Sequence, residues 1–146
     1  MARPRFLLPA GALAALLLAG TAFAQPDPVP TRKEGLRRMQ TNLEAIGAVA
    51  NAGGDTRDTV PRSDEMVAFF RNLPALFPSG SDGNGSRARP AVWSDRAGFE
   101  RAATNAVAAA EALRVSAGSG DAAATSQAVR AMGGACSACH RSYRSR

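Results

Sequence analysis

The sequence predicts an all-α protein folded as an antiparallel four-helix bundle. The chain is rich in alanine, aromatic residues make up only 5% of it, and no stretch alternates between apolar and polar residues as a strand does. Apolar residues recur instead at steps of three or four in four separate blocks, which is the period of a helix. The connections between these blocks are mostly short, and this favours a bundle of neighbouring antiparallel helices.

The first 24 residues, 1–24, predict a signal peptide that is removed from the mature protein. A short basic start precedes an apolar run over 6–20, and the sequence TAFAQ that follows carries the small-x-small spacing of a signal-peptidase site. The run is shorter than the roughly 20 residues that a membrane-spanning helix needs. We therefore expect cleavage between Ala24 and Gln25, export of the chain, and no membrane association afterwards.

The charge of the chain points to an ordinary solvated surface. The formal net charge is +6, and it falls to +4 when Arg3 and Arg5 leave with the signal peptide. The remaining basic residues are scattered among acidic ones and have few aromatic residues among them. This pattern is not typical of a nucleic-acid-binding face, so no nucleic-acid partner is expected.

The first two blocks predict helices over about 31–51 and 63–77. The sequence NAGG ends the first helix with glycine. Ser63 is expected to be the N-cap of the second helix, and Pro74 is expected to end or kink it. The apolar stripe of the first helix consists of Leu36, Met39, Leu43, Ile46 and Val49.

The chain from 78 to 90 is rich in Gly, Ser, Asp and Pro and predicts a loop. A third helix is expected to begin with Ser94 as its N-cap and to end at SAGSGD. The fourth is expected to begin near Asp121 and to run towards the C-terminus. Alanine dominates the facing stripes and buries little area, so a bundle of this size gains stability from a large apolar group in its centre.

The last helix carries the only two cysteines and the only histidine of the chain. Cys136, Cys139 and His140 form the pattern C-x-x-C-H, and three chemistries compete for it. A structural zinc site needs four ligands, so carboxylates would have to complete the set. A disulfide is possible in an oxidising compartment, but redox-active pairs lie at helix N-termini after a strand, whereas this pair lies late in a helix.

The third chemistry is covalent attachment of one haem c. Cysteines at positions i and i+3 project from one helix face, close enough to reach two vinyl groups of a single porphyrin. The histidine that follows can then bind the iron. Export supplies a suitable compartment, and a single histidine is what one axial ligand requires. The motif therefore favours haem c over zinc and over a disulfide.

With this motif, the sequence resembles the cytochrome c′ or class II cytochrome c family. The resemblance is carried by CSACHRSYR at 136–144, LFPSGS at 76–81, AVWSD at 91–95 and RKEGLRRMQTNLEAIGA at 32–48. It covers nearly the whole mature chain. It implies one class II cytochrome c domain over 25–146, a four-helix bundle with haem covalently attached to the C-terminal helix.

The resemblance also implies roles for single residues. Cys136 and Cys139 would form the thioethers, and His140 would be the axial iron ligand. Arg144, one turn after His140, would limit solvent access on the proximal side of the haem and tune the imidazole. Arg32 would lie near a haem propionate. For both arginines the alternative is an ordinary solvated surface charge.

The resemblance places Leu36 at the distal position of the haem. Leucine has no donor atom, and the chain has no second histidine, so five-coordinate iron in an apolar pocket is expected. Met39 lies one turn further on the same helix face and is the alternative sixth ligand. A methionine on an apolar stripe is more often part of the core.

These residues predict a periplasmic c-type cytochrome that binds diatomic gases such as NO and CO, transfers electrons, or does both, and that is not an enzyme. The alternative is a low-spin electron-transfer cytochrome with His140 and Met39 as axial ligands. A haem-free, disulfide-bonded bundle acting in adhesion or as a chaperone is a third hypothesis. A periplasmic redox partner is expected, and a homodimer through the first two helices is expected from the resemblance alone.

Overall fold

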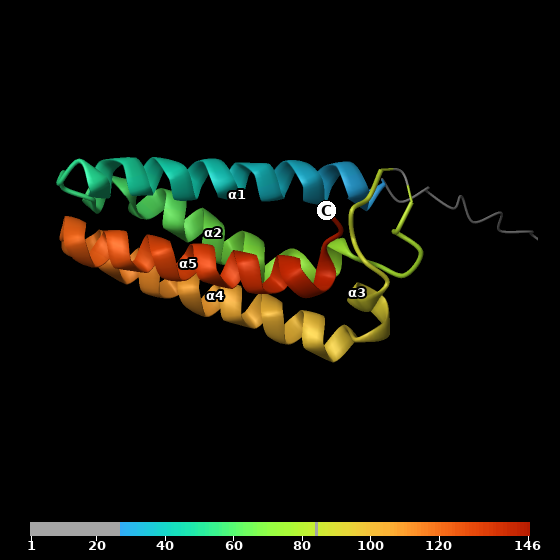
Figure 1. Ribbon diagram of the computed structural model, residues 1–146. Coiled ribbons are helices and arrows are strands. Elements are labelled where there is room, and N and C mark those ends of the chain that lie inside the picture. The colour runs from blue at the N-terminus through green and yellow to red at the C-terminus, as the bar shows by residue number, and fades with distance from the viewer. Residues whose placement is uncertain (1–26, 84) are drawn as a thin grey trace, which may run out of the picture.

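The computed structural model describes residues 27–83 and 85–146, and in these ranges it is an all-α bundle without a β-strand (Figure 1). The predicted fold class is confirmed. The predicted signal peptide lies outside the described residues and stays a prediction. The helices are α1 (Pro28–Asn51), α2 (Val60–Asn72), α3 (Ala91–Ser94), α4 (Arg96–Ser119) and α5 (Ala122–Tyr143), with the short 3-10 helices η1 (Arg57–Thr59) and η2 (Leu73–Leu76).

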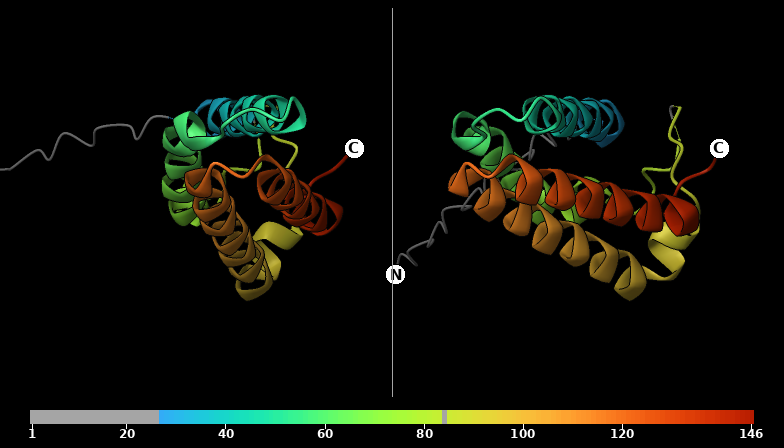
Figure 2. Two further views of the ribbon diagram at one scale, coloured as in Figure 1. Left: turned by 90° about the vertical axis from the view of Figure 1, so that its left-hand side faces the viewer. Right: turned by 60° about the vertical axis from the view of Figure 1, so that its left-hand side comes forward.

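The four long helices form a closed ring of neighbours. α4 packs against α2 and α5, and α1 packs against the same two helices (Figure 2). The connections on either side of α2 differ: a short one from α1 includes η1, whereas a longer one to α4 includes η2, the loop over 77–90 and α3. None of the helices in the described ranges is both long and apolar enough to cross a lipid bilayer.

Aspartates cap three of the long helices, α1, α4 and α5. α1 begins three residues before the expected Thr31, because the Asp27 carboxylate accepts a hydrogen bond at 2.9 Å from the backbone N–H two residues on. α4 begins after Asp95, whose carboxylate accepts from the backbone N–H three residues on at 3.1 Å. The expected N-cap Ser94 is instead the last residue of α3. Asp121 caps α5 as expected.

The expected start of the second helix is wrong. α2 begins at Val60, directly after η1, and Ser63 is fully buried inside the helix instead of capping it. Pro61 lies in the first turn of α2, where the missing N–H costs nothing because that group has no partner within the helix. The effect expected from Pro74 is confirmed, since α2 ends at Asn72 and the chain continues as the 3-10 helix η2.

The core is built from the apolar stripes of all four long helices. α4 contributes small residues that allow close approach, with Ala103, Ala106 and Ala110 buried against the neighbouring helices. Of the predicted stripe on α1, Met39 and Ile46 are buried, whereas Leu36 and Leu43 are only partly buried. Both partly buried leucines line the cavity described below.

Two residues of α4 provide a matched test of this packing. Leu113 is fully buried at 0% exposure, and Val115, two residues on, is 69% exposed. Leu113→Ala should lower the free energy of unfolding by about 2–5 kcal/mol, because it removes buried methyl groups and leaves a void. Val115→Ala should change it by less than about 0.5 kcal/mol. Equilibrium denaturant unfolding of the two variants checks this, and equal losses would contradict the assigned core.

Candidate functional site

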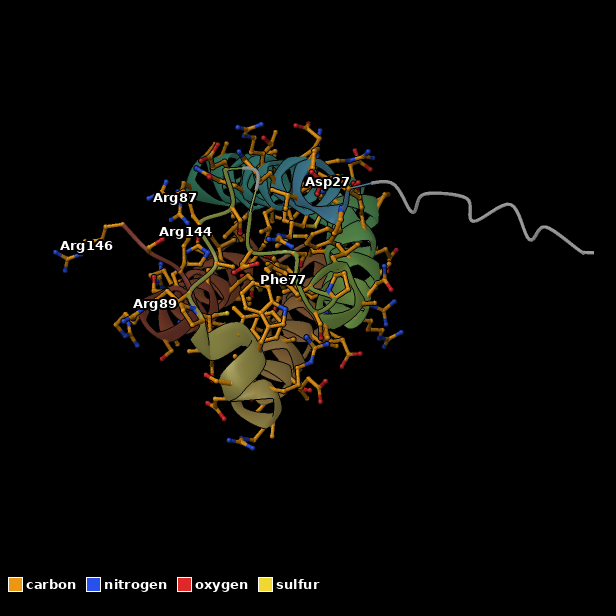
Figure 3. All side chains as sticks on the ribbon, turned by 90° about the vertical axis from the view of Figure 1, so that its right-hand side faces the viewer. Asp27, Phe77, Arg87, Arg89, Arg144 and Arg146 are labelled. Carbon is orange, nitrogen blue, oxygen red and sulfur yellow. The ribbon has the colours of Figure 1, made fainter. Side chains whose placement is uncertain are left out.

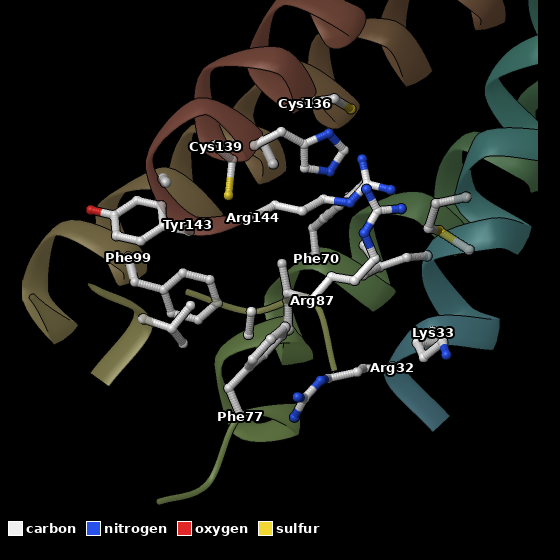
Figure 4. Close-up of a pocket in the computed structure, with 18 of the residues that line it drawn as sticks. Arg32, Lys33, Phe70, Phe77, Arg87, Phe99, Cys136, Cys139, Tyr143 and Arg144 are labelled. Carbon is white, nitrogen blue, oxygen red and sulfur yellow. The ribbon is translucent and has the colours of Figure 1, made fainter. Parts of the chain in front are cut away.

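A cavity of about 690 Å³ opens at the end of the bundle that carries the C-terminus (Figure 4). All four long helices, η2, α3 and the loop over 77–90 contribute to its lining. The volume lies within the range of roughly 300–1,000 Å³ that is usual for ligand and cofactor sites. Its deep part is apolar, formed among others by Met66, Phe70, Leu73, Val92 and Phe99.

Cys136, Cys139 and His140 all line this cavity from α5. The helix places them at positions i, i+3 and i+4, which share one helix face. Both cysteines are free and half-buried. Burial raises the pKa of the Cys136 and Cys139 thiols, so both stay protonated at neutral pH and lack the thiolate character of an active redox pair.

The His140 imidazole is kept neutral. Its partial burial lowers its pKa, and the nearby guanidinium groups of Arg144 and Arg87 lower it further. A neutral imidazole has a free nitrogen lone pair, which is the form that binds a metal ion. Over residues 27–83 and 85–146, no group of three or more His, Cys, Asp or Glu side chains is placed to hold a metal ion, so a zinc site finds no ligand set there.

The α1 wall of the cavity carries both residues expected on the distal side, Leu36 and Met39. Leu36 is partly buried and packs against the edge of the core, whereas Met39 is only 4% exposed and belongs to the core itself. The structure therefore brings Leu36, Met39 and His140 to one cavity. Gln40 also contributes to the lining, but its amide Nε2 donates a hydrogen bond to Glu44 at 2.8 Å.

Arg32 is not a surface charge, because its side chain is only 2% exposed. Its Nη1 donates to the backbone oxygen of Leu76 at 3.2 Å and to Ser81 Oγ at 2.8 Å. Its Nη2 donates to the backbone oxygen of Ser81 and, at 2.6 Å, to Ser86 Oγ. The guanidinium also lies over the Phe77 ring, 4.3 Å from its centroid. Arg32 thus fastens the loop over 77–90 to α1.

The other side of this loop is fastened to the end of α5. Arg89 N–H donates to the Tyr143 backbone oxygen at 2.9 Å, and Ser145 N–H donates to that of Arg87 at 2.8 Å, around an isolated bridge between Ala88 and Arg144. Figure 3 shows Arg87 and Arg144 as neighbours on this face. Arg144 is exposed and lines the mouth of the cavity, one turn after the imidazole.

Tyr143 fixes the last turn of α5 against α4. Its hydroxyl donates to Asp95 Oδ2 at 2.8 Å, and this hydrogen bond raises the pKa of Tyr143. Its ring packs edge-on against Phe99, with centroids 5.4 Å apart. Phe99 in turn packs edge-on against Phe77, at 5.0 Å. The contacts among these three aromatic rings therefore hold α5, α4 and the start of the loop together beneath the cavity.

Several lining residues were not found from the sequence. Arg87, Lys33 and Arg37 line the cavity, and the sequence shows them only as part of a scattered basic surface. The sequence showed Tyr143 as the aromatic residue that follows the haem motif, but it did not predict the hydrogen bond between Tyr143 and Asp95. The positions of these side chains depend on the path of the loop, which local sequence patterns do not specify.

The residues present suit a porphyrin. The interior of the cavity is apolar, as a macrocycle requires, and one wall offers two thiols and a neutral imidazole on the same helix face. The lining contains Arg and Lys side chains at five positions and no Asp or Glu, which suits a group that carries carboxylates.

Comparison with known proteins shows which family the chain belongs to. The family model described as cytochrome C′ matches residues 27–144. The chain belongs to the cytochrome c′ family. This family carries covalently attached haem c, so the cofactor of the chain is one haem c, and the cytochrome fold expected from the sequence is confirmed.

Individual members of the cytochrome c′ family match over most of their length. Cytochrome c′ from Rubrivivax gelatinosus is 42% identical over 126 residues, which is 84% of this chain and 98% of the relative. A solved cytochrome c′ with ligand-controlled dimer dissociation superposes with a TM-score of 0.78 at 27% identity, covering 86% of this chain and 100% of that chain. A nitric oxide complex of a cytochrome c prime variant from Alcaligenes xylosoxidans has a TM-score of 0.75 at 26% identity, covering 85% and 98%.

Replacing Arg32 should release the loop. Arg32→Gln cannot make the four hydrogen bonds to η2 and the loop, and buried acceptors left without a donor cost about 1–3 kcal/mol each. Amide hydrogen exchange over residues 78–86 should become faster, with little change in α4. The control is Lys33→Gln, because Lys33 is exposed and makes one long hydrogen bond to the loop, at 3.4 Å to Gly85. Unchanged exchange in the Arg32 variant would refute the anchoring role.

Proposed function

We propose that this chain is a periplasmic cytochrome c′ whose haem iron has one protein ligand, His140, and an open sixth position that binds NO and CO. Cys136 and Cys139 form the thioethers in this proposal. When bound, haem c supplies an iron centre that takes up small diatomic gases and exchanges one electron. The observation that carries the proposal is the position of Leu36, which has no donor atom and lines the same cavity from α1 that His140 lines from α5.

The residues of the chain select the ligand in this arrangement. Leu36 and Leu43 present hydrocarbon to the cavity, so a charged or strongly hydrated ligand beside them loses hydration and finds no polar partner in these two side chains. The amide that α1 contributes, Gln40, donates one of its two N–H groups to Glu44, and neither Leu36 nor Leu43 has a donor that could steady bound dioxygen. Neutral diatomic gases lose the least hydration free energy when they enter the cavity. The nitric oxide complex among the similar structures supports NO as a ligand.

The neutral His140 imidazole suits the role of the single axial ligand. Arg144 lies one turn further along and lowers the pKa of the imidazole, so the ring does not compete for a proton at neutral pH. We assign Arg144 the proximal role of covering this side of the ring and tuning its basicity. Its place at the mouth of the cavity supports this role.

A second candidate function rests on Met39. Its side chain lines the same cavity as His140, so a thioether is available on the α1 wall. Ligation by Met39 would give a low-spin electron-transfer cytochrome without a free gas site. Its burial in the core, at 4% exposure, argues against this, because binding iron would require it to leave its packing partners.

The cellular setting is part of the proposal. The predicted signal peptide supports export to the periplasm, where an electron donor would reduce the haem. The relatives are named as cytochromes, which supports a role in gas binding or electron transfer rather than enzymatic turnover. The relative with ligand-controlled dimer dissociation supports a homodimer for this chain as well.

The optical spectrum of the reduced holoprotein tests the coordination. Open coordination predicts a broad high-spin Soret band that sharpens and shifts when CO is added, because CO fills the empty sixth position. A sharp low-spin spectrum that does not respond to CO would move the assignment to the Met39-ligated carrier. Titration with CO at constant pH measures the response.

Met39→Ala separates the two candidates further, with Met132→Ala as its matched control. Met132 is fully buried on α5 and does not line the cavity, so its loss reports packing alone. The proposal predicts that both variants keep the high-spin spectrum and the response to CO. If Met39 binds iron, its variant alone changes from low to high spin.

A further inference from the structure

The mouth of the haem cavity has an unbalanced charge. Its lining includes Arg32, Lys33, Arg37, Arg87 and Arg144, and no lining residue is acidic. A haem carries two carboxylates, so one or more of these cations should meet them. The family resemblance implied this role for Arg32, and the contacts of the five side chains show which of them has free N–H donors.

Arg32 has almost no free N–H donors. A guanidinium has five N–H donors, four of them on its two terminal nitrogens. In Arg32 the terminal nitrogens make four hydrogen bonds to η2 and to the two loop serines, Ser81 and Ser86. Only the Nε–H remains, on a side chain that is 2% exposed. A carboxylate could bind Arg32 in the usual two-pronged way only by displacing the loop.

Two of the other cations are also engaged. Arg37 makes an ion pair with Glu34 at 3.5 Å, and Lys33 donates to the Gly85 backbone oxygen at 3.4 Å. Arg87 and Arg144 differ from them. Across residues 27–83 and 85–146, neither of these two guanidinium groups makes an ion pair or a side-chain hydrogen bond.

The backbone of Arg87 is nevertheless fixed. Its carbonyl oxygen accepts from Ser145 N–H at 2.8 Å and from Ser145 Oγ at 3.0 Å, beside the bridge between Ala88 and Arg144. In Figure 4 its side chain extends into the mouth of the cavity, next to that of Arg144. Both side chains line the same cavity as the imidazole of His140. Two like charges side by side repel each other, and an anion bound between them would remove this repulsion.

We propose that Arg87 binds a haem carboxylate at the mouth of the cavity, in place of Arg32. Arg32 is then a positioning residue that holds the loop from which Arg87 extends. The guanidinium of Arg87 offers a pair of parallel N–H donors, which matches a carboxylate better than a lysine does. The proposal rests on the presence of haem c and not on the open sixth position, so it holds for either candidate function.

The test compares Arg87→Gln with Arg89→Gln in the holoprotein. Both residues are exposed loop arginines, so each variant loses one positive charge, but Arg89 does not line the cavity and donates to the Arg141 backbone oxygen at 3.0 Å. A cation in contact with a haem carboxylate favours the reduced iron. Arg87→Gln should therefore lower the equilibrium constant for reduction by roughly threefold or more. Arg89→Gln should lower it clearly less, and Arg87→Lys should restore part of the loss.

Redox titration measures the equilibrium constant for reduction of the three variants. The fold does not depend on the Arg87 side chain, because the hydrogen bonds of Arg87 run through its backbone. Equal shifts for Arg87→Gln and Arg89→Gln would overturn the proposal. A crystal structure of the holoprotein gives a second outcome. An Arg87 nitrogen within hydrogen-bond distance of a haem carboxylate supports the assignment, and Arg32 alone at that position overturns it. The response to CO is measured separately and reports only on the sixth position of the iron. A failure of the proposed gas binding can therefore be told apart from a failure of the proposed Arg87 contact.

Discussion

The site depends on the register of α5. One turn of this helix brings two thiols and an imidazole to the same face, and the helix is held so that this face lines a cavity of about 690 Å³. The Tyr143 hydrogen bond to Asp95 and the edge-on ring contacts beneath it fix the last turn against α4. A rotation of α5 by one residue would turn the imidazole away from the cavity by about 100°.

The cavity in turn follows from the composition of the helices. Alanines on the buried face of α4 let the helices approach each other closely, but they bury little apolar surface. The core is therefore well filled around Ile46 and Leu113 and open around the cysteines. Haem c completes the core at this end, so the same group supplies both apolar packing and the iron. This explains how a small, alanine-rich chain can reach stability.

The sequence predicted the helices and the haem motif because both depend on local spacing. The period of the apolar residues located four helices, and C-x-x-C-H located three residues on the last of them that line the cavity. The expected caps Ser63 and Ser94 were wrong, because a neighbouring segment extends α2 upstream as η1 and because Asp95 supplies the cap of α4. The contacts of Arg32 could not be predicted from any local pattern, because they depend on the loop, which returns to both α1 and α5 and occupies the donors of Arg32.

Peptide mass mapping of the purified protein tests the central claim, covalent haem attachment, most directly. Trypsin cleavage after Arg130 and Arg141 releases residues 131–141, which contain both cysteines and the histidine. The account predicts that this peptide carries the added mass of one haem, bound through both sulfurs. An unmodified peptide, or one with an internal disulfide, would contradict it.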